Sequence, residues 1–206
     1  MAVKKKPEER KLEILDAAEK IFVQKGYEET SVQDILRSLQ MSKGGFYHHF
    51  ASKEEVLDSI IKRYIDQMME AAQMVVSNTE LNAKQKLLQM LGAMQISGHD
   101  SDEILTQLHH PQNRTMHLKS LLESAKALTP YFGAIARQGI EDGLFHMDYP
   151  EEIMEALFMT ATIWFDEIFF DFTPEEKRKR GAAFLEIAEK CSGVERGTFR
   201  EMEEMM

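Results

Sequence analysis

The sequence predicts an all-α protein built in two helical layers. Apolar residues recur at helical spacing along most of the chain, and glycine or proline separates many of these segments. Two capping boxes, Thr30 with Gln33 and Ser52 with Glu55, mark helix starts. A chain of 206 residues is long enough for one large domain or two small ones. We therefore expect a small three-helix domain and then a larger helical domain, with about nine helices in all.

The first helix is expected to begin at Pro7 or Glu8 and to end at Gly26. Proline suits a first helical turn, and glycine tolerates the left-handed conformation that closes many helices. The buried stripe of this helix would be Ile14, Ala17, Ala18, Ile21 and Phe22. The lysines at positions 4–6 could form a basic arm that touches DNA, or a solvated tail.

Two short helices should follow. The first begins near Ser31, and its buried residues are Val32, Ile35, Leu36 and Leu39. Ser42 is a further N-cap, so residues 43–49 form a helix of barely two turns. Gly44 and Gly45 each cost this helix about 1 kcal/mol relative to alanine, and such a local penalty is typical of a functional site.

Bare backbone at the two glycines would let this helix lie close against another surface. Lys43, Tyr47, His48 and Lys53 would surround it with charge and hydrogen-bonding groups. Two helices joined by a tight turn, the second short and exposed, form the helix-turn-helix motif, whose second helix enters the DNA major groove. An ordinary helical corner with a solvated tip is the alternative.

One ordered series of residues in the first third of the chain decides between these interpretations. The series is Ile14, Ala17, Ala18, Phe22, Gly26-Tyr27, Thr30-Ser31-Val32, Ile35, Ser42-Lys43-Gly44-Gly45-Phe46-Tyr47-His48-His49-Phe50 and Ser52-Lys53-Glu54. With this series, residues 10–64 resemble the N-terminal domain of the TetR family of bacterial transcriptional regulators. The rest of the chain is similar to the family only in length and helical pattern.

The resemblance implies a set of DNA-contacting residues. The set is Thr30, Ser31, Gln33, Ser42, Lys43, Gly44, Gly45, Tyr47, His48 and Lys53. Tyr47 and His48 would reach phosphates or base edges, and Gly44 would allow close approach. The family usually has glycine in the turn where this chain has Gln40, so we expect a strained turn there, at about 1 kcal/mol, or a slightly different one.

The DNA-binding domain is expected to span residues 1–50, and an effector-binding and dimerisation domain residues 51–206. A helix over about 52–76 would link them, because no strong breaker occurs before Ser77 and Asn78. Its N-terminus would direct backbone amides at a phosphate.

Three helices are expected in the middle of the chain. Ala83 to Ile96 would be the first, closed by Ser97 and Gly98, and Asp102 to His110 the second. The third would run from Asn113 to Asp142 and be interrupted or kinked at Pro130.

A strongly apolar helix is predicted from Glu151 to Phe172. It carries apolar residues on two sides, so it must be covered twice, by its own subunit and by a partner. A last helix would open at Pro174 and stop at Gly193. The pair resembles the helices through which the family dimerises, and the implied interface residues are Ile153, Leu157, Thr160, Ala161, Trp164, Ile168, Phe172, Ala183 and Ile187. Residues 195–206 are expected to fray.

Charge is distributed unevenly along the chain. The total is −10, but residues 1–63 hold 12 Lys and Arg against 11 Asp and Glu, a net of +1. The acidic remainder argues against non-specific coating of nucleic acid and leaves a local phosphate-binding site possible. A single cysteine, Cys191, excludes an internal disulfide framework. No signal peptide or membrane-spanning stretch is recognisable, so we expect a cytoplasmic protein with no membrane partner.

The larger domain has material for an apolar pocket, because the chain holds 14 methionines and 12 phenylalanines. The family usually binds an effector there, and the candidate residues are Met90, Met94, Met116, Phe132, Trp164 and Phe165. Asp166 or Glu167 could favour a cationic ligand or could simply be exposed. His109, His110 and His117 lack the spacing of a metal site.

No nucleophile elbow, phosphate loop or dinucleotide fingerprint occurs, so we expect neither enzymatic activity nor a cofactor. The predicted function is a homodimeric, repressor-type regulator. It would bind a palindromic double-stranded operator and be released by a small hydrophobic or amphipathic effector. A helical protein-interaction module without DNA binding is the main alternative, and an enzyme that uses the apolar cavity is a third.

Overall fold

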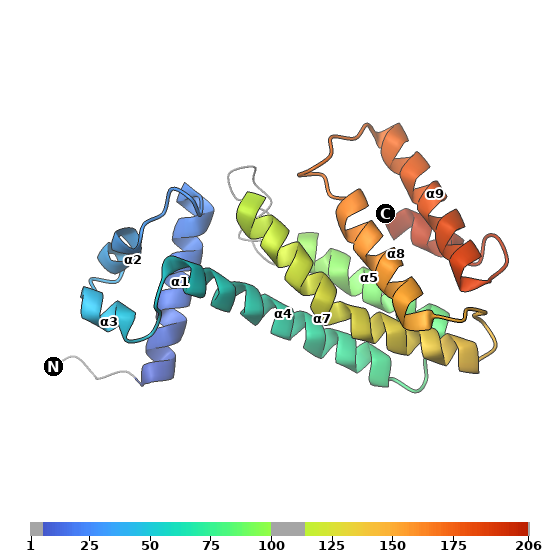
Figure 1. Ribbon diagram of the computed structural model, residues 1–206, viewed down its shortest axis with the longest axis horizontal. Helices are drawn as coiled ribbons and strands as arrows, with labels where there is room; N and C mark the ends of the chain where they lie inside the picture. Colours follow the sequence, from blue (N-terminus) through green and yellow to red (C-terminus); the bar gives the residue numbers. More distant parts are fainter. Residues whose placement is uncertain (1–5, 100–113, 206) are drawn as a thin grey trace. The chain divides into compact units, whose positions relative to one another are not determined.

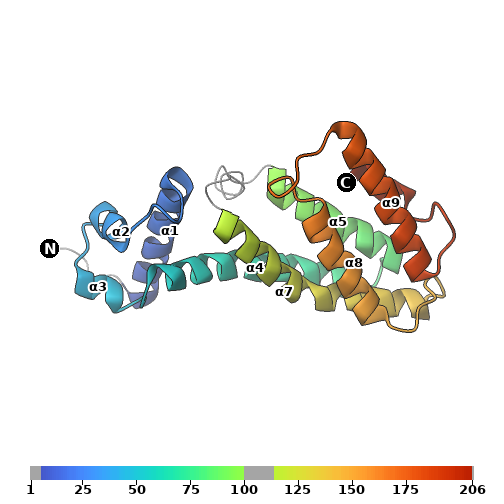
Figure 2. The same cartoon turned by 45° about the horizontal axis from the view of Figure 1, so that its top comes forward.

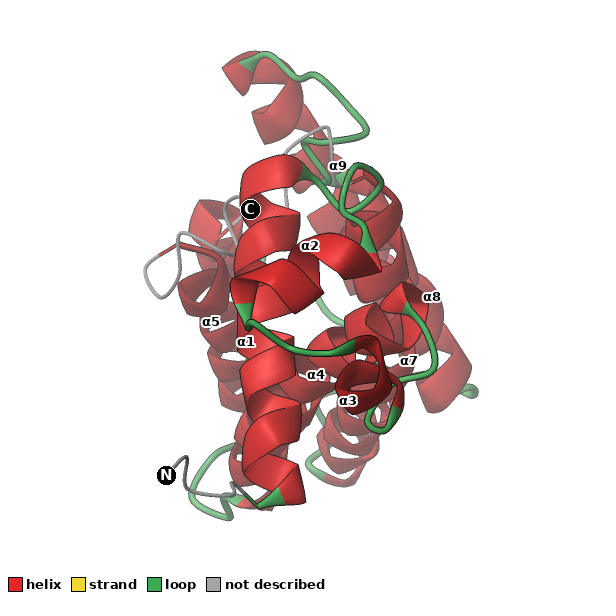
Figure 3. Ribbon diagram, turned by 90° about the vertical axis from the view of Figure 1, so that its left-hand side faces the viewer, coloured by secondary structure: helices red, strands yellow, loops and turns green. Residues whose placement is uncertain are grey.

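The prediction of an all-α fold is confirmed by the computed structural model, which describes residues 6–99 and 114–205 (Figure 1). Side chains are described for residues 6–93 and 114–202. Over these ranges the chain forms helices and no strand (Figure 3). The elements in chain order are α1 Pro7–Lys25, α2 Val32–Ser38, α3 Lys43–Tyr47, α4 Lys53–Ser77, α5 Ala83–His99, α7 Arg114–Glu141, α8 Pro150–Trp164, α9 Pro174–Ser192 and the 3-10 helix η2 Arg200–Met205.

The described chain divides into two compact units. The head unit comprises residues 6–66 and 114–120, and the body unit comprises residues 67–99 and 121–205. The head unit therefore extends beyond the expected boundary at residue 50. The reason is that the first four turns of α4 bury apolar side chains such as Val56 and Ile60, both 0% exposed.

The head unit places α2 and α3 together on one side of α1 (Figures 1 and 2). Its most deeply buried side chains include Ile14, Phe22, Ile35, Phe46, Phe50 and Leu57. The short helix α3 is held by two of them, since the Phe46 and Phe50 rings lie 6.1 Å apart and are at most 1% exposed. Burial of two aromatic rings explains how five residues containing two glycines remain helical.

Polar contacts fix α4 within the head unit. The buried carboxylate of Glu19 on α1 pairs with Arg63, at 2.6 Å from Nη2, and accepts a hydrogen bond from the Tyr64 hydroxyl. Lys119 on α7 pairs with Asp58, which raises the pKa of the Lys119 ammonium. A carboxylate buried as deeply as that of Glu19 requires such partners, whereas the Lys119–Asp58 pair is more exposed.

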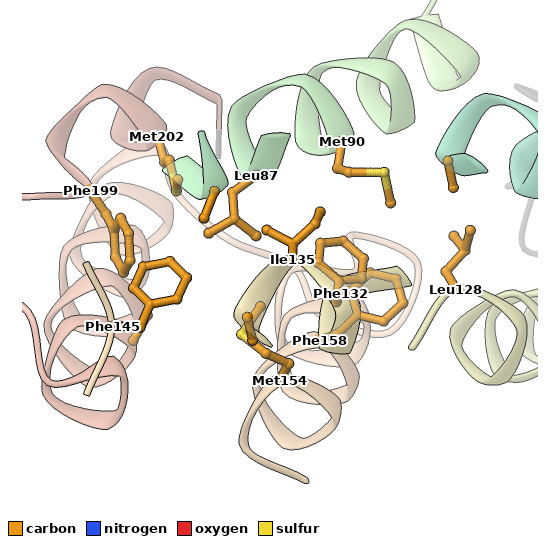
Figure 4. Close-up of a cluster of buried hydrophobic side chains, with 14 of the residues drawn as sticks. Leu87, Met90, Leu128, Phe132, Ile135, Phe145, Met154, Phe158, Phe199 and Met202 are labelled. Carbon is orange, nitrogen blue, oxygen red and sulfur yellow. The ribbon is translucent and has the colours of Figure 1, made fainter. Parts of the chain in front are cut away.

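The body unit has a continuous apolar core drawn from distant parts of the sequence (Figure 4). Its side chains include Leu87, Met90, Leu128, Phe132, Ile135, Phe145, Met154, Phe158, Phe199 and Met202. The Phe132 and Phe158 rings are 4.5 Å apart, which joins α7 to α8. Helices α8 and α9 lie side by side.

The expectation that residues 195–206 fray is wrong for the described side chains. Phe199 and Met202 are 3% and 5% exposed and complete the core of the body unit. The buried Glu189 carboxylate on α9 holds this end of the chain, because Oε1 accepts hydrogen bonds from the backbone N–H groups of Gly197 (2.8 Å) and Phe199 (2.9 Å). We call residues 193–202 the C-terminal segment.

The predicted helix from Glu151 to Phe172 ends earlier, at Trp164. The Asp166 carboxylate accepts hydrogen bonds from the N–H groups of Ile168 (2.9 Å) and Phe169 (3.1 Å). Aspartate competes with the helix in this way, because its side chain satisfies backbone donors in a turn. Ile168 and Phe172 therefore do not continue the stripe of α8.

The remaining predicted helix boundaries differ in their outcome. Helix α7 is continuous through Pro130, which is exposed, so that water can reach the carbonyl freed by the proline. Helix α5 continues through Ser97 and Gly98 to His99. The expected helix from Asp102 to His110 and the lysines at positions 4 and 5 lie outside the described residues. The predicted starts at Pro7 and Pro174 and the left-handed stop at Gly193, with φ 65°, are confirmed.

Candidate DNA-binding site and body cavity

The turn between α1 and α2 positions the helix-turn-helix. The buried Thr30 hydroxyl donates a hydrogen bond to the Gly26 carbonyl (2.6 Å), and Thr30 does not cap α2. Ser31 is the N-cap instead, with its Oγ accepting from the Asp34 N–H (3.2 Å). The predicted capping box of Thr30 and Gln33 is therefore wrong by one residue.

Asp34 completes this cap. Its carboxylate accepts hydrogen bonds from the Lys25 ammonium (2.8 Å) and from the Ser31 N–H (2.9 Å). These bonds, with that of Lys25 the strongest, hold the pKa of the Asp34 carboxyl well below its usual range. The Asp34 carboxylate, in the first turn of α2, thus has its partners within the head unit.

Gln40 makes the turn between α2 and α3. Its φ is 48°, the one positive value at a residue other than glycine in the described chain. The strained alternative for this turn is therefore the correct one, at about 1–2 kcal/mol. Directly after it, Ser42 caps α3 by accepting a hydrogen bond from the Gly45 N–H (3.2 Å).

The outer surface of α3 consists of Lys43, Gly44, Tyr47 and His48, all exposed. We call these four residues the α3 surface. They occupy positions i, i+1, i+4 and i+5, so they share one side of a helical turn while Phe46 points into the core. Tyr47 is 53% exposed although it is aromatic. Its ring lies edge to face with the Phe46 ring, with 5.4 Å between the ring centres.

The two glycines of α3 have different surroundings. A Cβ added to Gly44 would meet no heavy atom within 4 Å, whereas one added to Gly45 would lie 3.3 Å from Met41 Cγ. Gly45 thus allows the helix to pack on its own turn. Packing within the head unit gives no reason for the missing side chain at Gly44.

Lys53, predicted to contact DNA, is half-buried and occupied within the head unit. Its ammonium donates to the Tyr27 carbonyl (2.7 Å) and lies 4.2 Å from the centre of the Tyr27 ring. It joins the start of α4 to the turn after α1. Gln33, Ser31 and Ser42 are exposed, and the two serines also serve as the N-caps of α2 and α3.

The geometry of α2, turn and α3 agrees with comparisons to known proteins. The model of bacterial regulatory proteins of the tetR family matches residues 14–60, and the model of the tetracyclin repressor-like C-terminal domain matches residues 98–187. The chain belongs to the TetR family. It is therefore a transcriptional regulator with an N-terminal helix-turn-helix domain and a helical C-terminal domain.

Relatives of this TetR-family regulator include repressors. The transcriptional repressor KstR2 of Mycobacterium tuberculosis is 28% identical over 158 residues, which cover 75% of this chain and 78% of KstR2. The structure of SmeT, repressor of the Stenotrophomonas maltophilia multidrug efflux pump SmeDEF, shares the fold with a TM-score of 0.67, 20% identity and 92% coverage of each chain. The SmeT–triclosan complex matches with a TM-score of 0.61 and 17% identity, over 93% of this chain and 94% of SmeT.

The body unit of the regulator contains a cavity of about 330 Å³, within the size range of small-molecule sites. It is lined by Leu87, Leu91, Phe132, Met154, Leu157, Phe158, Ala161, Thr162, Phe165, Lys177, Phe184, Leu185, Ala188, Ser192, Phe199 and Met202. Helices α5, α7, α8 and α9 contribute, and the C-terminal segment closes one side.

The structure brings two of the predicted effector residues, Phe132 and Phe165, together at this cavity. Met90 is buried in the body core, Trp164 packs against Phe165 with 5.9 Å between ring centres, and Met116 belongs to the head unit. The side chain of Met94 lies outside the described residues.

The predicted interface residues divide into three groups. Leu157 and Ala161 line the cavity, whereas Thr160, Ala183 and Ile187 are exposed, Ile187 by 45%. The remaining ones, Ile153, Trp164, Ile168 and Phe172, are half-buried. Sequence periodicity could not separate these groups, because the cavity-lining Leu157 and Ala161 and the exposed Thr160 belong to the same predicted stripe.

Over the described residues, no three His, Cys, Asp or Glu side chains gather in a way that could hold a metal ion, and His109 and His110 lie outside that range. None of the helices described is long and apolar enough to cross a membrane.

Proposed function

We propose that this TetR-family regulator is a repressor that binds a palindromic operator as a homodimer and is released by a small hydrophobic or amphipathic effector. The proposal of DNA binding depends most on one observation at Gly44. Its backbone is exposed, although a Cβ at this position would meet no heavy atom within 4 Å in the head unit. A helix without a side chain at this position can approach the floor of a major groove closely.

The α3 surface supplies the direct contacts. Lys43 binds phosphate, and Tyr47 and His48 reach phosphates or base edges. Ser31, Gln33 and Ser42 hold the register along the DNA backbone. Thr30 and Lys53 act indirectly, because their polar atoms are occupied in holding the turn between α1 and α2.

Dimerisation uses the exposed face of α8 and α9. Thr160, Ala183 and Ile187 are exposed there, and the small side chains permit close approach of helices from a second copy. A two-fold dimer would read two half-sites about 34–36 Å apart or a multiple of that distance. The relationship to KstR2, a transcriptional repressor, supports repression as the mode of action.

The body cavity is the proposed effector site. SmeT, which shares the fold, has been solved as a complex with triclosan. An effector would release DNA by binding more tightly to a dimer whose heads are wrongly spaced, and only this difference in affinity can shift the equilibrium.

Replacing Gly44 with alanine tests the DNA-binding proposal. The new methyl group meets nothing in the free head unit, and alanine favours the helix by about 1 kcal/mol, so the melting temperature should stay the same or rise. In the complex the methyl group would press against DNA, and overpacking of about 1–3 kcal/mol corresponds to a loss of about 5- to 150-fold in affinity. Gel retention on DNA from upstream of the coding region, together with calorimetry, measures both effects.

Unchanged retention of Gly44→Ala would contradict close approach by α3. If the wild-type chain does not bind this DNA but binds a protein through the α3 surface, the protein-interaction alternative is correct. Footprinting at two salt concentrations separates these outcomes, since phosphate contacts make DNA affinity fall steeply with salt.

A further inference from the structure

The lining of the body cavity is apolar with one charged exception. Among the described side chains that line it, only Thr162, Lys177 and Ser192 are polar. The Thr162 hydroxyl donates to the Phe158 carbonyl of its own helix (2.8 Å), so its proton is already engaged. Lys177, in the first turn of α9, is therefore the charged group available to a bound molecule.

Lys177 is held only loosely by its protein partner. Its ammonium lies 2.6 Å from Glu167 Oε1, and the two side chains are 43% and 64% exposed. Ion pairs with this exposure contribute little, because water and salt screen them. A second carboxylate could therefore share or replace Glu167 with little penalty.

The acidic residues next to Lys177 already have partners. Asp166 accepts hydrogen bonds from two backbone N–H groups in the turn after α8. Glu167 points to its partner Lys177 and is not part of the lining. The alternative, that Asp166 or Glu167 favours a cationic ligand, stays a prediction.

We propose that the cavity binds a single-chain amphiphile with an apolar tail and a terminal carboxylate, whose carboxylate pairs with Lys177. This inference rests on the proposed effector function of the same cavity. The tail is covered by the leucine, methionine and phenylalanine side chains of four helices and the C-terminal segment, which supply most of the affinity. The carboxylate supplies the discrimination between ligands of equal tail length.

Isothermal titration of the full-length regulator with decanoate, decanol and decylamine tests the proposal, at concentrations below micelle formation. Decanoate should bind about two- to fivefold more tightly than decanol, the range for a half-exposed ion pair, and decylamine should bind most weakly. Lys177→Met, which keeps the apolar stem, should abolish the preference for decanoate and leave decanol binding unchanged. Lys177→Arg should retain the preference.

Glu167→Gln provides a second, independent variant. It frees the Lys177 ammonium from its competing partner, so decanoate should bind more tightly than to the wild type while decanol does not change. The proposal is overturned if decylamine binds most tightly, if the preference for decanoate persists in Lys177→Met, or if none of the three binds.

Operator release is measured separately by fluorescence anisotropy of labelled DNA. Decanoate that binds through Lys177 without releasing DNA would support the inference and contradict the proposed effector function. Release of DNA by decanol and decanoate alike, with no dependence on Lys177, would support the effector function and overturn the inference.

Discussion

Replacing Lys43 and Tyr47 together with alanine should weaken operator binding by about a hundredfold or more. The two side chains lie four residues apart on α3, so they reach the same stretch of DNA. Each head loses the phosphate contact of Lys43 and the base or phosphate contact of Tyr47. A dimer has two heads, so the favourable free energy of DNA binding falls by about 3 kcal/mol or more in total.

Stability should hardly change in the same variant. Both side chains are exposed, and surface substitutions of this kind usually alter the free energy of unfolding by about 0.5 kcal/mol or less. The matched control is Lys126→Ala with Tyr149→Ala, which removes the same two residue types from the surface of the body unit, where Tyr149 is 67% exposed. Equal loss of retention in both double variants would show that charge and aromatic surface in general, rather than the α3 surface, bind DNA.

Replacing Glu189 with alanine should lower the free energy of unfolding by about 2–4 kcal/mol. The carboxylate accepts hydrogen bonds from two backbone N–H groups of the C-terminal segment, those of Gly197 and Phe199. Alanine leaves both groups without this acceptor. The buried Phe199 donor left unpaired costs about 1–3 kcal/mol, and the part-buried Gly197 donor adds a smaller amount. Because Phe199 and Met202 line the cavity, the same variant should bind decanol more weakly.

Urea denaturation followed by circular dichroism measures this effect. Glu186→Ala is the matched control, since Glu186 lies on the same helix but is exposed and pairs with Lys190 in a surface ion pair. It should shift stability by less than about 1 kcal/mol. If Glu189→Ala unfolds at the same urea concentration as Glu186→Ala, the carboxylate does not hold the C-terminal segment.

Local signals in the sequence were sufficient to predict the helix-turn-helix. Ser42 caps α3 as expected, and Phe46 and Phe50 hold it, because these interactions join residues within one or two helical turns. The error at Thr30 has a local cause that composition does not reveal. Its hydroxyl donates to the Gly26 carbonyl, and the next residue, Ser31, is the N-cap.

Features that depend on particular side-chain-to-backbone hydrogen bonds, or on contacts between separate segments, were not predictable in this way. Asp166 ends α8 although the apolar period continues to Phe172, because a side-chain bond to the backbone outweighs periodicity there. The buried C-terminal segment depends on Glu189, which reads as an ordinary helix-surface glutamate in the sequence. Lys177 was likewise overlooked at the cavity, since charged residues in a first helical turn are usually exposed.

The dependence of operator affinity on salt is the most direct test of DNA binding through α3. Binding of the wild-type dimer and of Lys43→Ala to labelled DNA from upstream of the coding region should be measured between low and physiological salt. We expect log affinity to fall steeply and linearly with log salt for the wild type, and Lys43→Ala to reduce the slope by about 2, because one phosphate contact is lost from each head. A wild-type affinity that is independent of salt, or a slope that Lys43→Ala leaves unchanged, would contradict DNA binding through α3.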